Sequence, residues 1–153
     1  MTTTEPARPP EQRKQDTMKL LRAEQDAWVA TASPDGQPCL VPLSFVWESE
    51  SLLMCTKRTT PTARNLASGT SVIVTLGHTR DVVLIEGTGQ LIDAARLPAA
   101  AADAFAAKLV WDPRQQTEWI YMRITPRVIK AWREENELAG RVLMRDGAWT
   151  ARR

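Results

Sequence analysis

Residues 70–92 read TSVIVTLGHTRDVVLIEGTGQLI, and this stretch decides the fold class. The β-branched run 70–76 and the longer apolar run 82–92 predict two strands, because such residues fit a pleated sheet. The segment between them is short and polar, which predicts antiparallel pairing. Gly87 and Gly89 lie inside the second run, where glycines indicate a bulge or the close approach of another backbone or a ligand.

Three more strands are predicted upstream, and they form a meander. They occupy residues 27–32, 37–47 and 52–56. The turn Ser33-Pro34-Asp35-Gly36 joins the first two, because proline presets one backbone angle, aspartate bonds its own backbone and glycine accepts a positive φ. A polar turn at residues 48–51 joins the second and third strands.

The other predicted elements are two helices, two strands and a turn. A short helix follows Thr60, which suits the N-cap, and Pro61, which suits the first helical position. An alanine-rich helix is predicted at residues 97–109. The last strands are predicted at 119–125 and 128–133, separated by Pro126, and Asp146-Gly147 is a hairpin-type turn.

These elements define a mainly β fold. The total is six or seven strands, mostly adjacent in sequence, with three short helices. Closure of such a sheet into a barrel removes its exposed edges. We therefore expect an antiparallel, six- or seven-stranded β-barrel with peripheral helices.

The chain of 153 residues has the length of one domain. Residues 1–10 hold three prolines and predict a mobile N-terminal arm, whereas residues 11–153 predict a single domain that opens with a helix at 11–25. No apolar run approaches the ~20 residues of a membrane span, and the N-terminus has no apolar stretch typical of a signal peptide. With only two cysteines, we expect a cytoplasmic protein.

Charge and composition argue against several function classes. The net charge of +2 is too balanced to indicate a nucleic-acid or membrane partner. One histidine and two cysteines lack the spacing of a zinc site, so we expect no metal. No nucleophile elbow, Walker A motif or dinucleotide glycine motif is present, and no catalytic residue can be named.

Residues 56–66 (TKRTTPTARNL) predict a phosphate cradle. A strand ends there, and the start of the following helix offers free N–H groups. Lys57, Arg58 and Arg64 add positive charge, and four threonines add hydroxyl donors. The alternative interpretation, a solvated basic loop before a capped helix, stays open on spacing alone.

Several segments, taken in their order and spacing, carry a family resemblance. They are 28–31 (WVAT), 34–38 (PDGQP), 41–45 (VPLSF), 56–66, 83–91 (VLIEGTGQL), 124–128 (ITPRV) with Trp132, and the tail 141–149. Together they resemble the pyridoxamine 5′-phosphate oxidase-like superfamily, the flavin-binding split β-barrels that include deazaflavin (F420)-dependent reductases. The resemblance implies a split barrel of the FMN-binding type, usually a homodimer with cofactor sites at the subunit interface. The implied cofactor is FMN, with F420 as the alternative.

The resemblance also implies which residues contact the cofactor. The ring edge would be lined, largely by backbone, by Val41, Pro42, Leu43 and Ser44. The ring or ribityl chain would lie near Cys55, Thr56 and Lys57. The phosphate would be held by Thr62 and Arg64, and the ring would also meet Asp81. A late tryptophan and arginine, often from the second subunit, correspond to Trp132 and Arg141.

Two departures from the family pattern bear on function. Where many members have Ser-Arg-Lys before the short helix, this chain has Thr60-Pro61-Thr62, so two phosphate-binding charges are missing. Where true pyridoxamine phosphate oxidases have Arg-x-His-x-Arg, this chain has residues 137–141 (ELAGR), and only the last arginine matches. We therefore do not expect the reaction for which the family is named.

The leading hypothesis is an oxidoreductase that transfers hydride between FMN or F420 and a small organic substrate. The alternative is a non-catalytic barrel that binds or senses a flavin or haem-type ligand. Among the six tryptophans, Trp28 and Trp119 are expected in the core, and Trp132 and Trp149 at a site or interface. Cys39 and Cys55 are expected to be buried strand residues without a redox role.

Overall fold

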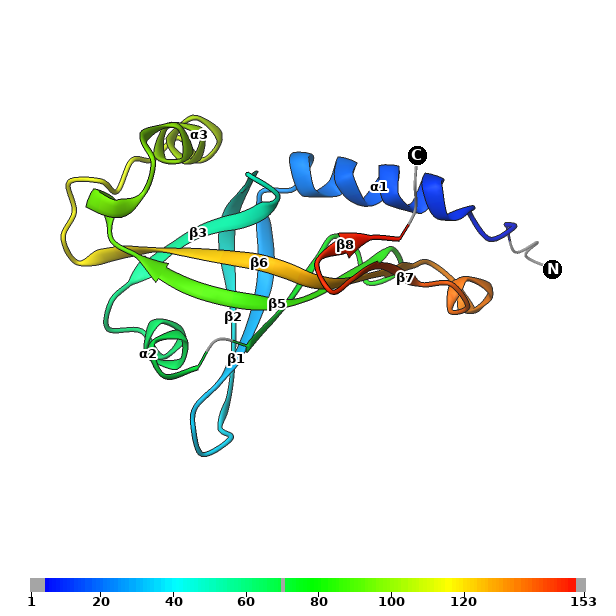
Figure 1. The fold of residues 1–153 in the computed structure, drawn as a ribbon, viewed down its shortest axis with the longest axis horizontal. Helices are drawn as coiled ribbons and strands as arrows, with labels where there is room; N and C mark the ends of the chain where they lie inside the picture. Colours follow the sequence, from blue (N-terminus) through cyan, green and yellow to red (C-terminus); the bar gives the residue numbers. More distant parts are fainter. Residues whose placement is uncertain (1–4, 70, 151–153) are drawn as a thin grey trace.

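The computed structural model describes residues 5–69 and 71–150, and its centre is one curled antiparallel sheet (Figure 1). The strands run in the order β3-β2-β1-β4-β5-β6-β7-β8. Their bounds are β1 (Asp26–Ala32), β2 (Pro38–Glu48), β3 (Ser51–Lys57), β4 (Ser71–Leu76), β5 (Val82–Ile92), β6 (Trp119–Trp132), β7 (Val142–Arg145) and β8 (Ala148–Trp149). The helices are α1 (Pro10–Ala23), α2 (Pro61–Ser68) and α3 (Ala99–Leu109), with short 3-10 turns η1 (Ala94–Arg96) and η2 (Glu135–Glu137).

The sheet closes on itself through β3 and β6. These strands pair from Leu52 opposite Ile124 to Lys57 opposite Trp119, so six strands form a ring. Further along, β6 leaves β3 and pairs with β7 at Ile129 and Lys130, and the barrel is split there. The predicted mainly β split barrel with peripheral helices is confirmed, and the hairpin β7–β8 brings the described strands to eight.

The prediction of two strands around Pro126 was wrong, because β6 runs unbroken through it. Pro126 lies opposite Gly87, where the register between β5 and β6 shifts by a bulge. A proline has no N–H to donate, and a bulge is one of the few places where a sheet accepts it. A Cβ at Gly87 would lie 2.5 Å from the Thr125 carbonyl oxygen, so the expected close backbone approach is confirmed.

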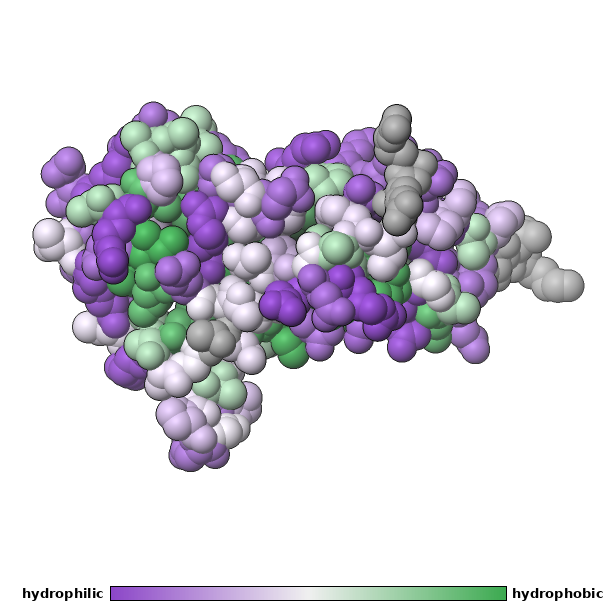
Figure 2. All heavy atoms as spheres, in the orientation of Figure 1, coloured by the Kyte–Doolittle hydropathy of each residue, from purple (hydrophilic) through white to green (hydrophobic). Residues whose placement is uncertain are grey.

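Two hydrophobic clusters hold the fold together. The first fills the barrel interior with residues such as Val29, Phe45 and Ile85, and Leu21 of α1 and Leu66 of α2 join it. The second lies between the outer wall and α3. It contains Val46, Leu53, Cys55, Leu97, Ala101, Ala102, Phe105 and Tyr121. Figure 2 shows apolar surface gathered at α3 and beside it, whereas the regions of α1 and β7 are mostly hydrophilic.

Helix α2 begins at the capping residue that the sequence predicts. Thr60 caps α2 by accepting a hydrogen bond from the Ala63 N–H at 3.2 Å, and Pro61 fills the first helical position, as predicted.

Residues 1–4 of the predicted N-terminal arm lie outside the described residues. Arg8, in the same arm, contacts Glu137 near the other end of the chain.

Candidate functional site

The residues predicted to contact a cofactor fall into two groups. The first, which we call the α2 half-site, comprises Val41–Ser44 on β2, Cys55–Lys57 at the end of β3, and Thr62 and Arg64 on α2. Side-chain contacts join the helix to the strands. The Cys39 Sγ lies 3.7 Å from the Thr62 Oγ1, and the Asn65 amide donates to the Thr31 Oγ1 at 3.0 Å. These contacts fix the start of α2 against β1 and β2.

The predicted residues of β2 lie along the middle of that strand. Val41 and Leu43 are half-buried against the barrel interior, and Pro42 faces outward beside Trp28. The Ser44 hydroxyl donates to an Asp26 carboxylate oxygen at 2.6 Å. Since side chains alternate between faces, only the backbone of this segment could follow one face of a flat ligand.

Three predicted side chains of the α2 half-site are buried. Thr62 is 1% exposed, and the Thr56 hydroxyl lies 3.2 Å from that of Thr60. Burial raises the pKa of the Cys55 thiol to about 12, so this cysteine is neutral near pH 7 and is no nucleophile. Lys57 and Arg64, in contrast, are exposed at the surface.

The cations of this half-site are not equivalent. Arg58 is already engaged, because it pairs with Asp93 at 2.6 Å and donates to the Thr117 carbonyl. The Arg64 guanidinium donates to the Thr59 carbonyl at 2.8 Å, and the Lys57 ammonium lies 5.6 Å from the centre of the Trp119 ring. Among the residues that the structure describes, Lys57 and Arg64 pair with no carboxylate and can therefore receive an anion.

The backbone at the start of α2 offers fewer donors than an ordinary helix end. Pro61 has no N–H, and the N–H of Ala63 is taken by the Thr60 cap. An anion here would depend on the Lys57 and Arg64 charges more than on the helix. The backbone N–H groups at the start of α2 therefore do not compensate for the positive charges missing at residues 60–62.

The second group, the β6 half-site, comprises Asp81, Trp132 and Arg141. Trp132 ends β6 opposite Val82, the residue after Asp81. The Arg141 carbonyl accepts a hydrogen bond from the Ala131 N–H at 2.9 Å. The backbone thus brings these three predicted residues together at one end of β6.

Lys57 of the α2 half-site and Trp132 of the β6 half-site lie at opposite ends of β6. Lys57 pairs with Trp119, and Trp132 lies thirteen residues further along the strand. At about 3.3 Å per residue, this separation is roughly 40 Å. A single flavin-sized ligand therefore cannot contact both Lys57 and Trp132 of one chain.

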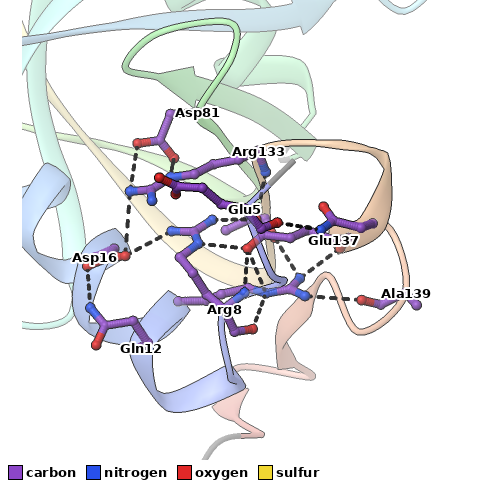
Figure 3. Close-up of polar contacts among 11 residues, drawn as sticks. Glu5, Arg8, Gln12, Asp16, Asp81, Arg133, Glu137 and Ala139 are labelled. Carbon is purple, nitrogen blue, oxygen red and sulfur yellow. Dashed lines mark hydrogen bonds and ion pairs between the residues drawn. The ribbon is translucent and has the colours of Figure 1, made fainter. Parts of the chain in front are cut away.

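Beside the β6 half-site lies a polar cluster that the sequence did not reveal (Figure 3). The carboxylate of Glu137 is 3% exposed and accepts hydrogen bonds from the Arg8 backbone N–H, Nε and Nη2, and from the Arg133 N–H, all at 2.8–2.9 Å. The bonds from the Arg8 side chain lower the pKa of Glu137 to about 2. We call Arg8, Arg13 and Glu137 the N-terminal clamp.

Arg13 completes the clamp from α1. It is 4% exposed, and its guanidinium donates to the carbonyls of Ala131, Glu137 and Ala139 at 2.8–3.2 Å. The only signal in the sequence was Glu137 itself, a carboxylate where the resembled family has a substrate-binding arginine. The structure shows that Glu137 faces the N-terminal segment.

The outward face of β2, β1 and β4 carries exposed apolar side chains. Trp28, Leu40 and Ile73 are 51%, 62% and 44% exposed there. The prediction that Trp28 lies in the core was wrong, because the alternation of β1 places Ala27 and Val29 inward and Trp28 outward. Two open grooves, about 580 and 500 Å³, lie along this face. Their lining includes Ala30, Ile73, Glu86 and Arg127 in the first, and Trp28, Pro42 and His78 in the second.

The arrangement defines a class, the split β-barrel with peripheral helices. The pyridoxamine 5′-phosphate oxidase family model matches residues 14–133. The chain therefore belongs to the pyridoxamine 5′-phosphate oxidase family. No curated protein matches the chain.

Solved structures share the fold at low sequence identity. A FAD-binding protein from Mesorhizobium loti is 19% identical, with a TM-score of 0.61 over 76% of this chain and 89% of that one. An F420 reductase is 17% identical, with a TM-score of 0.58 over 72% and 93%. The haem-storage protein HutZ from Vibrio cholerae is 14% identical, with a TM-score of 0.60 over 74% and 89%. None of the helices in the described part of the chain is long and apolar enough to cross a membrane.

Proposed function

We propose that the protein binds FMN, or alternatively F420, and transfers hydride between that cofactor and a small organic substrate. The observation that carries the proposal is the pair of exposed cations, Lys57 and Arg64, at the start of α2 on a barrel of this family. Neighbours described as a FAD-binding protein and an F420 reductase support it. The fit is reasonable, since both cofactors carry phosphate and the two cations have no carboxylate partner among the described residues.

In this proposal the chain's residues bind and orient the cofactor. Lys57 and Arg64 hold the phosphate by charge-assisted hydrogen bonds. The backbone of Val41–Ser44 follows the ring edge, and Cys55, Thr56 and Thr62 shape the wall beneath it. When bound, the cofactor supplies the hydride chemistry through its ring, so the protein needs no acid–base pair of its own.

We further propose a homodimer in which a second copy supplies the β6 half-site. One chain cannot bring Lys57 and Trp132 to one ligand, because they are roughly 40 Å apart along β6. The apolar outward face with Trp28, Leu40 and Ile73 supports such an assembly, since contiguous exposed apolar surface marks interaction sites. Asp81, Trp132 and Arg141 of one copy would then contact the cofactor held by Lys57 and Arg64 of the other.

Oxidation of pyridoxamine phosphate is not part of the proposal. Glu137 stands where the family has the first substrate-binding arginine, and its carboxylate already accepts four hydrogen bonds. Ala139 stands where the family has a histidine. No phosphate grip for that substrate is left in this segment apart from Arg141.

The second candidate is non-catalytic binding of a flavin or haem-type ligand. The missing charges at Thr60-Pro61-Thr62 favour it, because they weaken any phosphate grip. The similarity to a protein described as a haem-storage protein also supports it. Both candidates use the same barrel and differ in whether a substrate is turned over.

A titration separates these candidates. Purified protein is titrated with FMN, F420 and haem, each followed by visible absorption and by quenching of tryptophan fluorescence. Saturable micromolar binding of FMN or F420, followed by oxidation of the reduced cofactor in the complex by a small electron acceptor such as a quinone, supports the proposed oxidoreductase. Haem binding alone, or flavin binding without turnover of any acceptor, favours the second candidate, and binding of none of the three overturns both.

A further inference from the structure

The N-terminal clamp connects parts of the chain that are far apart in sequence. Arg8 and Glu137 are separated by 129 residues, yet the guanidinium of Arg8 meets the Glu137 carboxylate through two nitrogens at 2.8 and 2.9 Å. A fork of this kind fixes orientation as well as distance. The clamp therefore holds the residues before α1 against the segment between β6 and β7.

The clamped segment, residues 133–141, lies between two of the residues assigned to the β6 half-site. Trp132 precedes it and Arg141 ends it. Its regular backbone hydrogen bonds are few, from Glu137 and Leu138 N–H to carbonyls three residues earlier. Exposed side chains dominate it, and Glu137 is its buried anchor.

Arg8 and Arg13, which lie outside the segment, add side-chain hydrogen bonds to it. Arg13 bonds the carbonyls of Ala131, Glu137 and Ala139, which lie on both sides of the turn. Arg141 bonds the Leu138 carbonyl at 2.9 Å, so its own side chain rests on the clamped backbone. The position of the Arg141 guanidinium is thus set by the segment that Arg8 and Arg13 hold.

The same network of ion pairs also contacts Asp81, the remaining residue of the β6 half-site. Arg8 pairs with Asp16 at 3.0 Å, and Asp16 lies 3.6 Å from the Arg133 guanidinium. Arg133 in turn lies 3.3 Å from Asp81 (Figure 3). Asp81, Trp132 and Arg141 are therefore all one contact or one peptide bond away from the clamped network.

We propose that Arg8 and Arg13 are positioning residues for the β6 half-site, and that through Glu137 they hold Arg141 and Trp132 in the geometry that receives a cofactor from a second copy. This inference rests on the proposed function for the identity of the ligand. Neither arginine touches the cofactor in this scheme. The N-terminal segment acts on the site indirectly, through the backbone of residues 133–141.

The test compares Arg8→Met with the full-length parent by two measurements. The first is amide hydrogen exchange in the cofactor-free protein, at the N–H groups of Arg133, Glu137 and Leu138. The second is the dissociation constant for FMN and for F420. We expect exchange of these amides to be at least tenfold faster in Arg8→Met, and cofactor affinity to fall about tenfold.

Two control variants separate positioning from general loss of stability. Arg123→Met removes a half-buried ion pair with Glu48, 3.0 Å long, that lies well away from the clamp. It is expected to lower the melting temperature while leaving exchange in 133–141 and cofactor affinity unchanged. Arg8→Lys keeps the positive charge but cannot form the two-nitrogen contact with the Glu137 carboxylate. Its amide exchange rates and its cofactor affinity are expected to lie between those of Arg8→Met and the parent.

Each outcome decides a separate point. Equal exchange of the three amides in Arg8→Met and Arg123→Met overturns the positioning role. So does accelerated exchange with unchanged cofactor affinity in a parent that binds. If the parent binds neither FMN nor F420, the proposed function fails. The exchange measurement then still decides whether the clamp orders residues 133–141.

Discussion

Leu66 of α2 packs directly on the backbone of Gly89 in β5, where a Cβ would lie 2.5 Å from the Leu66 Cδ2 and 2.9 Å from the Val72 Cγ2. The absence of a side chain at residue 89 lets α2 sit close enough to the barrel for Leu66 to join the interior core. Because Lys57, Thr62 and Arg64 surround the start of the same helix, this contact also sets where the proposed phosphate site lies.

We expect Gly89→Ala to displace α2. The added methyl group should lower the free energy of unfolding by about 1–3 kcal/mol, as overpacking in a filled core does. It should also weaken FMN or F420 binding, which fluorescence titration can measure. Gly69→Ala is the matched control, since its added Cβ meets nothing closer than 3.7 Å. Equal cofactor affinities for Gly89→Ala and the parent would contradict the link between this contact and the site.

Arg64→Met should weaken cofactor binding by roughly ten- to a hundredfold, which corresponds to about 1.4–2.8 kcal/mol. The physical reason is the loss of one charge-assisted hydrogen bond to phosphate. The melting temperature should hardly change, because the side chain is exposed and bonds one carbonyl. Arg58→Met, a neighbouring arginine already paired with Asp93, should retain the parent's affinity. An Arg58→Met loss as large as that of Arg64→Met would reassign the phosphate contact.

Trp28→Lys should convert the expected homodimer into a monomer without unfolding it. Trp28 is half-exposed on the apolar outward face of β1, so a charge there is tolerated in one chain and opposes burial against another. Light scattering measures the mass, and circular dichroism checks the fold. Val110→Lys changes an exposed apolar residue outside that face and should leave the mass unaltered. A parent mass near 17 kDa at micromolar concentration argues against the shared site.

Glu137→Gln should alter how stability depends on pH. The folded-state pKa of Glu137 is lowered from about 4.5 to about 2, so its ionised form stabilises the fold above pH 4.5, and this contribution is lost as pH falls toward 2. At pH 7 the variant should be less stable than the parent by about 1–3 kcal/mol, and the difference should shrink between pH 5 and 2. Urea unfolding at several pH values measures this. Glu134→Gln, which removes an exposed ion pair with Arg80, is the control and should change stability little at pH 7.

Val110→Gly should stabilise the protein by about 1 kcal/mol. Val110 follows α3 with φ 52° and ψ 41°, a left-handed conformation that a β-branched residue adopts only with strain. Its side chain is 89% exposed, so its removal sacrifices little packing. Thermal unfolding of Val110→Gly and Val110→Ala distinguishes the causes. If glycine is less stable than alanine at this position, the strain explanation is wrong.

Local patterns predicted most of the fold. Residues 71–76 and 82–92 become the paired strands β4 and β5, whereas residue 70 of the first predicted run lies outside the described residues. Asp146-Gly147 forms the predicted hairpin turn with both residues at positive φ. The failures lie where tertiary contacts override local signals. Pro126 reads as a strand end until the bulge opposite it is known, and the side of β1 that faces inward cannot be inferred for Trp28 from the apolar content of a short strand alone.

The candidate site was less accessible to sequence reasoning. The segment 56–66 suggested Lys57 and Arg64, but not that Arg58 is neutralised by Asp93 across 35 residues. The clamp depends on Arg8 and Glu137, whose partnership no spacing rule covers. Such pairs form because the complete fold brings the N-terminal segment next to the connection between β6 and β7.

The pairing of β3 with β6 also has a consequence for how the chain folds. β3 ends at Lys57 and its partner begins at Trp119, so the ring cannot close until β4, β5 and α3 have been made. During synthesis the meander β1–β3 forms by local contacts, which are fast, whereas closure must overcome the entropy of a long loop. Until then the edge of β3 stays unpaired and its apolar residues uncovered, a state prone to aggregation. Chains that terminate before β6 should therefore accumulate in inclusion bodies, because the last third of the sequence protects the first.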